Sequence, residues 1–126
     1  MLLKKIYLRN KDKFELVVED WSNRMKIQVE VFDGKESLTD TVDSLVILHE
    51  DHNISKENKD LRELLERSHK PTHQVDINAT INASITQLRF WLENNKPNNV
   101  LFVGDDKLLK SSRLNDYFEK LSNNLN

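Results

Sequence analysis

Hydrophobic residues recur along this chain with two different periods, and the two periods predict an alternation of strands and helices. Alternating or continuous apolar runs of roughly four to eight residues indicate β-strands, whereas apolar residues spaced three and four apart indicate amphipathic helices. The strand patterns occupy residues 4–8, 26–32, 45–48, 72–77 and 100–103. The helix patterns occupy residues 13–24 and three segments that begin after Ser55, after Asn78 or Thr80, and after Ser112. Residues 35–42 are polar and carry neither pattern.

This order of elements predicts the fold class. Strands that are separated by helices are joined by right-handed crossovers, which gives a mostly parallel sheet with helices on both faces. We therefore expect residues 1–126 to form a single three-layer α/β domain, Rossmann-like or flavodoxin-like. Its five-stranded, mostly parallel sheet should carry four helices on its two faces.

The type of each strand pattern also predicts its place in the sheet. Residues 45–48 and 100–103 are apolar throughout, which is typical of strands covered on both faces, so we expect both inside the sheet. Residues 26–32 and 72–77 alternate between apolar and polar, and we expect them at the edges. The flavodoxin order 2-1-3-4-5 would leave the last strand at an edge, so the expected position of 100–103 departs from that order.

Several side chains have expected structural roles. Asp12 is expected to cap the helix at 13–24, with Glu15 as its capping-box partner. Trp21 and Trp91 lie on or beside apolar helical stripes and are expected to pack in the core. His69 and His73 are expected at the surface, at the amino edge of the sheet.

Composition excludes several functional classes. Nineteen Lys and Arg face 21 Asp and Glu, so no bulk basic field is available for nucleic acid or a membrane surface. Cysteine is absent, which excludes disulfides, thiolate nucleophiles and cysteine-ligated metals. The two glycines, Gly34 and Gly104, are too far apart to form a glycine-rich phosphate loop.

The chain shows neither a signal sequence nor a run near the ~18 apolar residues of a membrane span, so we expect a cytoplasmic protein.

Candidate chemistry is selected by position, because open parallel sheets bind ligands outside the carboxyl ends of their strands. The polar residues that follow the predicted strands are therefore the ligand-binding candidates. They are Arg9, Asn10, His49, Asp51, His52, Asp76, Asn78, Gly104, Asp105 and Asp106.

Two of these groups admit more than one interpretation. His49 to His52 places two imidazoles and two carboxylates together, which suits a metal, although a solvated turn explains the same residues. Gly104 can adopt a positive φ and allow a ligand to approach closely. Lys107, Lys110 and Arg113 follow it and could attract an anion to the start of the last helix, whereas the alternative is a tight turn with exposed charges.

From Asp40 onward the chain resembles the C-terminal part of the putative molybdenum carrier family, a Rossmann-like family of nucleotide-binding type. The matching residues include Asp43 to Leu48, Lys70-Pro71, Val75 to Ile77, Leu88, Trp91, Leu92, Asn99 to Gly104, Tyr117, Phe118 and Leu121. The family's glycine-rich turn after the first strand is here Arg9-Asn10-Lys11, and its Gly-Gly-Thr-like turn is here His49 to Asn53. Only Gly104 carries over from its Ala-Gly-Pro-Arg-like segment. The resemblance therefore implies a shared fold whose phosphate-binding parts have been replaced.

These observations favour a small non-catalytic binding domain. Its ligand at the carboxyl edge would be a protein partner or a small polar, nucleotide-like molecule, and self-association into a homodimer is a further expectation. Two alternatives stay open. One is an enzyme that acts on a nucleotide or glycosyl substrate through Asp76, Asp105 or Asp106 with His49 or His52. The other is a carrier of a metal or metal cofactor built on His49 and His52. The sequence identifies no cofactor.

Overall fold

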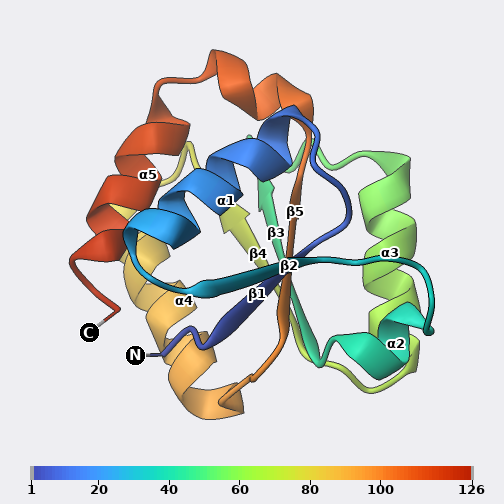
Figure 1. Cartoon of the computed structure of the whole chain (residues 1–126). Coiled ribbons are helices and arrows are strands. Elements are labelled where there is room, and N and C mark those ends of the chain that lie inside the picture. Colours follow the sequence, from blue (N-terminus) through green and yellow to red (C-terminus); the bar gives the residue numbers. More distant parts are fainter. Residues whose placement is uncertain (1, 126) are drawn as a thin grey trace.

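The computed structural model describes residues 2–125, which fold into the expected alternation of strands and helices (Figure 1). The elements in chain order are β1 (Lys5–Leu8), α1 (Lys13–Arg24), β2 (Gln28–Val31), α2 (Leu38–Thr41), β3 (Ser44–His49), α3 (Lys56–Arg67), β4 (Thr72–Asp76), α4 (Ile81–Asn95), β5 (Val100–Gly104), the 3₁₀-helix η1 (Asp106–Lys110) and α5 (Arg113–Ser122). Between Leu2 and Leu125, no helix combines the length and apolar character needed to cross a membrane.

The five strands of this described region form one sheet in the order β2-β1-β5-β3-β4, and every pair is parallel. The prediction that 45–48 and 100–103 lie inside the sheet is confirmed, as is the placement of the two alternating strands at its edges. β5 lies between β1 and β3, so the order departs from the flavodoxin order as expected. Every residue of β3 and β5 is buried.

Each face of the sheet has its own apolar core. α1, α4 and α5 cover one face, where their apolar residues pack against Val46, Leu48 and Phe102 of the inner strands. α3 and the short α2 cover the other face, against Leu45, Ile47 and Leu101. Figure 1 shows α1, α4 and α5 on one side of the sheet and α2 with α3 on the other. The three-layer prediction is therefore confirmed.

The two tryptophans pack against the core as expected, and one of them also covers a histidine. Trp21 is 1% exposed, and its ring centroid lies 5.0 Å from that of Phe118. Trp91 is half-buried against the same core and stacks on His73 at 5.5 Å. His73, expected at the surface, is half-buried, because Trp91 covers one side of its imidazole, and burial lowers the pKa of His73.

Two short helices escaped the sequence patterns. α2 lies within the segment expected to be unpatterned, because a four-residue helix contains little more than one turn in which to show a period. η1 lies between β5 and the helix expected after Ser112, in a segment to which no helix was assigned. The domain therefore has more helical segments than the four that were predicted.

The expected capping box at α1 is also wrong. Asp12 occupies the N-cap position of the helix, but its side chain makes no capping hydrogen bond. The backbone N–H of Phe14 instead donates to Asp106 Oδ1 at 3.2 Å, so a residue from η1 satisfies this helix end. Glu15, freed from the capping role, is 4% exposed.

Candidate functional site

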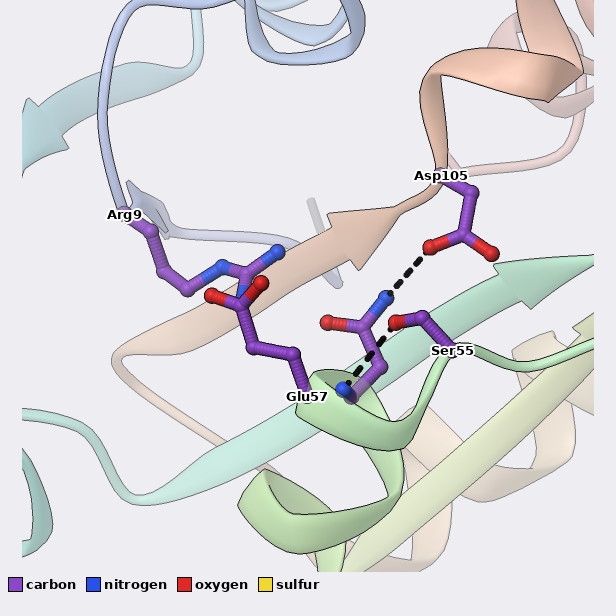
Figure 2. Close-up of polar contacts among 5 residues, drawn as sticks. Arg9, Ser55, Glu57 and Asp105 are labelled. Atoms are coloured by element: carbon purple, nitrogen blue, oxygen red, sulfur yellow. Dashed lines mark hydrogen bonds and ion pairs between the residues drawn. The ribbon is translucent and has the colours of Figure 1, made fainter.

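Three elements that are distant in sequence meet at the carboxyl edge of the sheet. Arg9 follows β1, Asp105 follows β5, and Ser55 and Glu57 belong to the start of α3, which follows β3 (Figure 2). Arg9 Nη1 donates to Glu57 Oε1 at 2.7 Å and so joins the end of β1 to the first turn of α3. The insertion of β5 between β1 and β3 explains why Asp105 stands beside this pair.

Asn58 is the buried polar residue beneath these groups. It is 1% exposed, although it lies in the first turn of a helix. Its backbone N–H donates to the Ser55 side chain at 3.2 Å, which confirms the N-cap predicted at Ser55. Its side-chain Nδ2 donates to Asp105 Oδ1 at 3.3 Å, while Asn58 Oδ1 has no hydrogen-bond partner among the described residues. Asn58 therefore orients the Asp105 carboxylate and leaves one buried acceptor unused.

An open groove runs along this edge beside Asp105. One part of it has a volume of about 450 Å³, and an adjoining part about 620 Å³. Asn53, Asp105 and Lys107 line both parts, so we treat them as one feature, the carboxyl-edge groove. The complete lining is Glu50, Asn53, Ile54, Ser55, Asp105, Asp106, Lys107, Leu108, Lys110 and Ser111.

The groove has a mixed electrostatic character. Lys107 and Lys110 are three residues apart on η1, and side chains at this spacing on a 3₁₀-helix are eclipsed, so the two ammonium groups share one side. Glu50 and Asp105 bring carboxylates to the same groove. Leu108 adds an apolar part to the lining. The arrangement suits a ligand that has an anionic group, hydrogen-bond donors and some apolar surface.

A second group of predicted residues forms a hydrogen-bonded loop next to the groove. Asp76, at the end of β4, accepts at Oδ1 from the backbone N–H groups of Asp51, at 3.2 Å, and Asn78, at 2.9 Å. The side-chain amide of Asn78 donates to Glu50 at 3.3 Å and to Asp51 at 3.1 Å. These contacts make Asp51, Asp76 and Asn78 supports of the loop after β3.

His49 anchors the same loop from inside. It is 2% exposed, and its Nδ1 accepts from the backbone N–H of His52 at 3.0 Å. The two imidazoles stack with their centroids 5.1 Å apart. Burial lowers the pKa of His49, and the nearby Asp76 carboxylate acts in the opposite direction.

The geometry gives little support to a metal site at His49 and His52. Within residues 2–125, no group of three or more His, Cys, Asp or Glu side chains is placed to hold a metal ion. One nitrogen of His49 is already occupied by the backbone N–H of His52. The two rings stack on one another instead of directing their nitrogens at a common point.

Gly104 does not serve the purpose expected of it. Within the described chain the positive-φ glycine is Gly34, with φ +79°, so Gly104 uses ordinary backbone geometry. A Cβ at Gly104 would lie 2.7 Å from two ring carbons of Phe14 and 2.9 Å from Leu108 Cδ1. The missing side chain therefore makes room for Phe14, a core residue, and not for a ligand.

The remaining predicted residues have structural roles as well. Asn10 accepts from the backbone N–H of Asp12 at 2.9 Å and so forms a turn. Asp106 is bonded to the start of α1, as described above. Arg113, expected to help attract an anion, donates to the carbonyls of Ile77 at 2.7 Å and Ala79 at 2.8 Å. Of the predicted ligand-binding residues, Asp105 and Asp106 thus line the groove, and Arg9 is paired with Glu57 at the same edge of the sheet.

Sequence reasoning missed three residues that interact with Arg9 or Asp105, namely Glu57, Asn58 and Glu15. Glu57 and Asn58 lie on a helix whose apolar stripe gives no hint of a buried asparagine. Glu15 is buried close enough to Arg9 for the two charges to interact, and its Oε2 lacks a partner in the described part of the chain. Burial raises the pKa of Glu15, with smaller contributions from Asp106 and Asp12, while Arg9 opposes the rise.

The fold and groove define an α/β protein of the Rossmann-like kind that presents a polar groove at the carboxyl edge. The chain is similar to the crystal structure of a putative molybdenum carrier protein from Syntrophus aciditrophicus, with a TM-score of 0.66 and 15% sequence identity. The match covers 95% of this chain and 92% of that chain, so the resemblance predicted from residue 40 onward is confirmed for the fold and extends further toward the N-terminus. The chain matches no protein-family model and no curated protein.

Proposed function

We propose that this protein binds a small molecule that carries both a phosphate group and hydrogen-bond donors, a nucleotide being the simplest example, in the carboxyl-edge groove. The observation that carries the proposal is that the groove contains two lysines on one side of η1 and, in addition, the Asp105 carboxylate, which the buried Asn58 holds in place. Lysine ammonium groups bind phosphate as point charges. The carboxylate supplies acceptors for hydroxyl or amino groups.

The shape and position of the groove support the same class of ligand. Its larger part, about 620 Å³, falls within the ~300–1,000 Å³ that small-molecule sites usually have. It lies outside the carboxyl ends of β3 and β5, where open parallel sheets bind ligands. Leu108 and Ile54 give the lining apolar surface against which a ring can pack.

Carriage of molybdenum is the second candidate, suggested by the name of the structurally similar protein. In neutral water molybdenum(VI) is a doubly charged tetrahedral oxyanion, which Lys107 and Lys110 would attract. Glu50 and Asp105 line the same groove and would repel an oxyanion that has no hydrogen-bond donors. The mixed lining therefore favours the nucleotide class over a bare oxyanion.

Isothermal titration calorimetry with AMP, ATP, ribose 5-phosphate, adenosine and molybdate tests both candidates. We expect the phosphorylated compounds to bind more tightly than adenosine and molybdate. Lys107→Met should weaken nucleotide binding by ~10-fold or more, the scale of a lost charge-assisted hydrogen bond. Lys4→Met is the matched control, because it removes the same charge but lies before β1, at the amino edge of the sheet and away from the groove. It should leave binding unchanged.

Two results would overturn the proposal. One is the absence of nucleotide binding at millimolar concentration in a protein shown to be folded by its circular dichroism spectrum. The other is nucleotide binding that Lys107→Met and Lys4→Met affect equally. Molybdate binding that is tighter than nucleotide binding and is lost in Lys107→Met would instead select the carrier function.

A further inference from the structure

One wall of the carboxyl-edge groove is a short loop with an unusual backbone. Glu50 and Asn53 line the groove and are joined by an antiparallel bridge, in which Asn53 N–H donates to the Glu50 carbonyl at 2.8 Å. Asp51 and His52, between them, both adopt left-handed backbone conformations, with φ +50° and +66°. Residues other than glycine pay a conformational cost there, so this loop needs stabilising contacts to keep its shape.

His49 supplies the contact that depends on a proton. Its Nδ1 accepts from the backbone N–H of His52 at 3.0 Å, which places the proton of the neutral ring on Nε2. Protonation of His49 adds a hydrogen to Nδ1, so two N–H groups would face each other across this distance. The His52 backbone amide would lose its acceptor, and the strained loop would lose an anchor.

We propose that His49 is a proton-operated latch on the carboxyl-edge groove: the neutral imidazole holds loop 50–53 in the shape seen here, and the protonated imidazole releases it. The latch itself is a property of the loop, and its effect on ligand binding rests on the proposed function. His49 is thereby a positioning residue, because it acts on the groove through Glu50 and Asn53.

The charged groups around His49 set the direction of the switch. Asp76, from β4, and Asp51, from the loop, favour protonation, whereas burial and the stacked His52 oppose it. Two other carboxylates of this edge have partners of their own: Glu57 of α3 pairs with Arg9, and Asp105 after β5 is bonded to Asn58.

Burial is the largest of these effects, so the pKa of His49 lies below its ordinary value of 6.5 while the latch is closed. The closed form therefore binds fewer protons than the released form. Its stability is complete above pH 6.5 and is lost as the pH falls below that value.

Nuclear magnetic resonance of the ligand-free protein between about pH 5 and 8 tests the latch directly. We expect the His52 backbone amide to shift together with the His49 ring protons, and its hydrogen-exchange protection to fall by ~10-fold or more on the acid side. His49→Asn is the key variant, since its side-chain oxygen can accept from the same amide but does not titrate. In His49→Asn the protection of the His52 amide should not respond to the change of pH. In His49→Phe, which keeps the bulk but has no acceptor, the amide should be unprotected throughout.

The outcomes separate the latch from the proposed function. A His52 amide that does not respond while His49 titrates would overturn the latch, and so would an acid-side loss of protection that persists in His49→Asn. The affinity for AMP is then measured across the same pH range in wild type and in His49→Asn. The phosphate of AMP also titrates in this range, but it affects both proteins equally, so a difference between the two pH profiles is due to His49. A confirmed latch with no nucleotide binding would refute the proposed function alone. Nucleotide binding with the same pH profile in both proteins would overturn control of the groove by His49.

Discussion

Replacement of Gly104 by alanine is the sharpest test of the packing at the carboxyl edge. The new methyl group would lie 2.7 Å from Cε2 and Cζ of Phe14 and 2.9 Å from Leu108 Cδ1, whereas carbon atoms in contact prefer ~3.5–4.0 Å. The leucine methyl is the end of a flexible side chain and can move. The Phe14 ring is 0% exposed within the core, so it must shift by about 1 Å against its neighbours to restore normal contacts.

The expected cost follows from the behaviour of overpacked cores. Crowding of this kind destabilises proteins by ~1–3 kcal/mol. For a chain of 126 residues, each 1 kcal/mol corresponds to a change in melting temperature of ~3–5 °C. We therefore expect Gly104→Ala to lower the melting temperature by ~3–15 °C in a thermal denaturation followed by circular dichroism.

A double-mutant cycle with Phe14→Leu identifies the cause. If the ring is what the methyl group meets, the two substitutions together should cost at least ~1 kcal/mol less than the sum of their separate effects. Gly34→Ala is the matched control: its Cβ meets nothing within 4 Å, so its cost comes from φ +79° and should be additive with Phe14→Leu. An unchanged melting temperature in Gly104→Ala, or strict additivity with Phe14→Leu, would refute the packing role of this glycine.

Three further substitutions test individual contacts. Glu15→Gln should raise the free energy of unfolding by about 1 kcal/mol at pH 7, because the amide fills the same buried space without a charge that has to be desolvated. The pKa of Glu15 is raised in the folded protein, so the wild type loses stability as the pH rises above 4.5. The advantage of Glu15→Gln, measured by urea titration, should therefore shrink as the pH is lowered toward 4.5. An advantage that does not change with pH would contradict a raised pKa of Glu15. Ser55→Ala should cost ~1 kcal/mol in thermal denaturation, whereas Ser112→Ala, which removes no side-chain cap bond, should cost clearly less; equal losses would contradict the capping role of Ser55. Arg113→Met, which removes the donors to the Ile77 and Ala79 carbonyls, should cost ~1.5–3 kcal/mol in the same assay; a neutral result would mean that water replaces both bonds without loss.

The positions of the strands within the sheet could be predicted because the burial of a strand determines which of its residues are apolar. A strand covered on both faces is typically a continuous apolar run, as Val100 to Val103 are, and this pattern argues against an edge position and so against the flavodoxin order. The edge strands could be recognised by the polar residues that alternate with their apolar ones. α2 could not be recognised, because one helical turn has no room for a helical period.

The location of the candidate site at the carboxyl edge could be predicted from the sequence, but only some of its residues could. The rule that ligands bind at the carboxyl ends selected Arg9 and Asp105, since both directly follow strands. It could not select Asn58, which bonds to Asp105 across 47 positions of sequence, or Glu57, which bonds to Arg9 across 48. These pairings depend on the insertion of β5 between β1 and β3. A hydrogen bond between two polar side chains also produces no periodic pattern in the sequence. The same rule also selected Asp76 and Asn78, whose bonds turned out to support a loop.

The shortage of glycine and the position of the groove are connected through Arg9. A glycine-rich turn after β1 would let a phosphate approach the backbone at the start of α1. Here that place carries Arg9, whose Nε is buried and whose guanidinium is fixed by Glu57 at the start of α3. With this pair across the end of β1, the proposed ligand must lie further along the edge, over β5 and β3. The lysines of η1 then take the part that backbone N–H groups play in a glycine-rich loop. An anion would be recognised by side-chain charge, so the proposed binding should weaken with added salt more steeply than binding to a backbone cradle would.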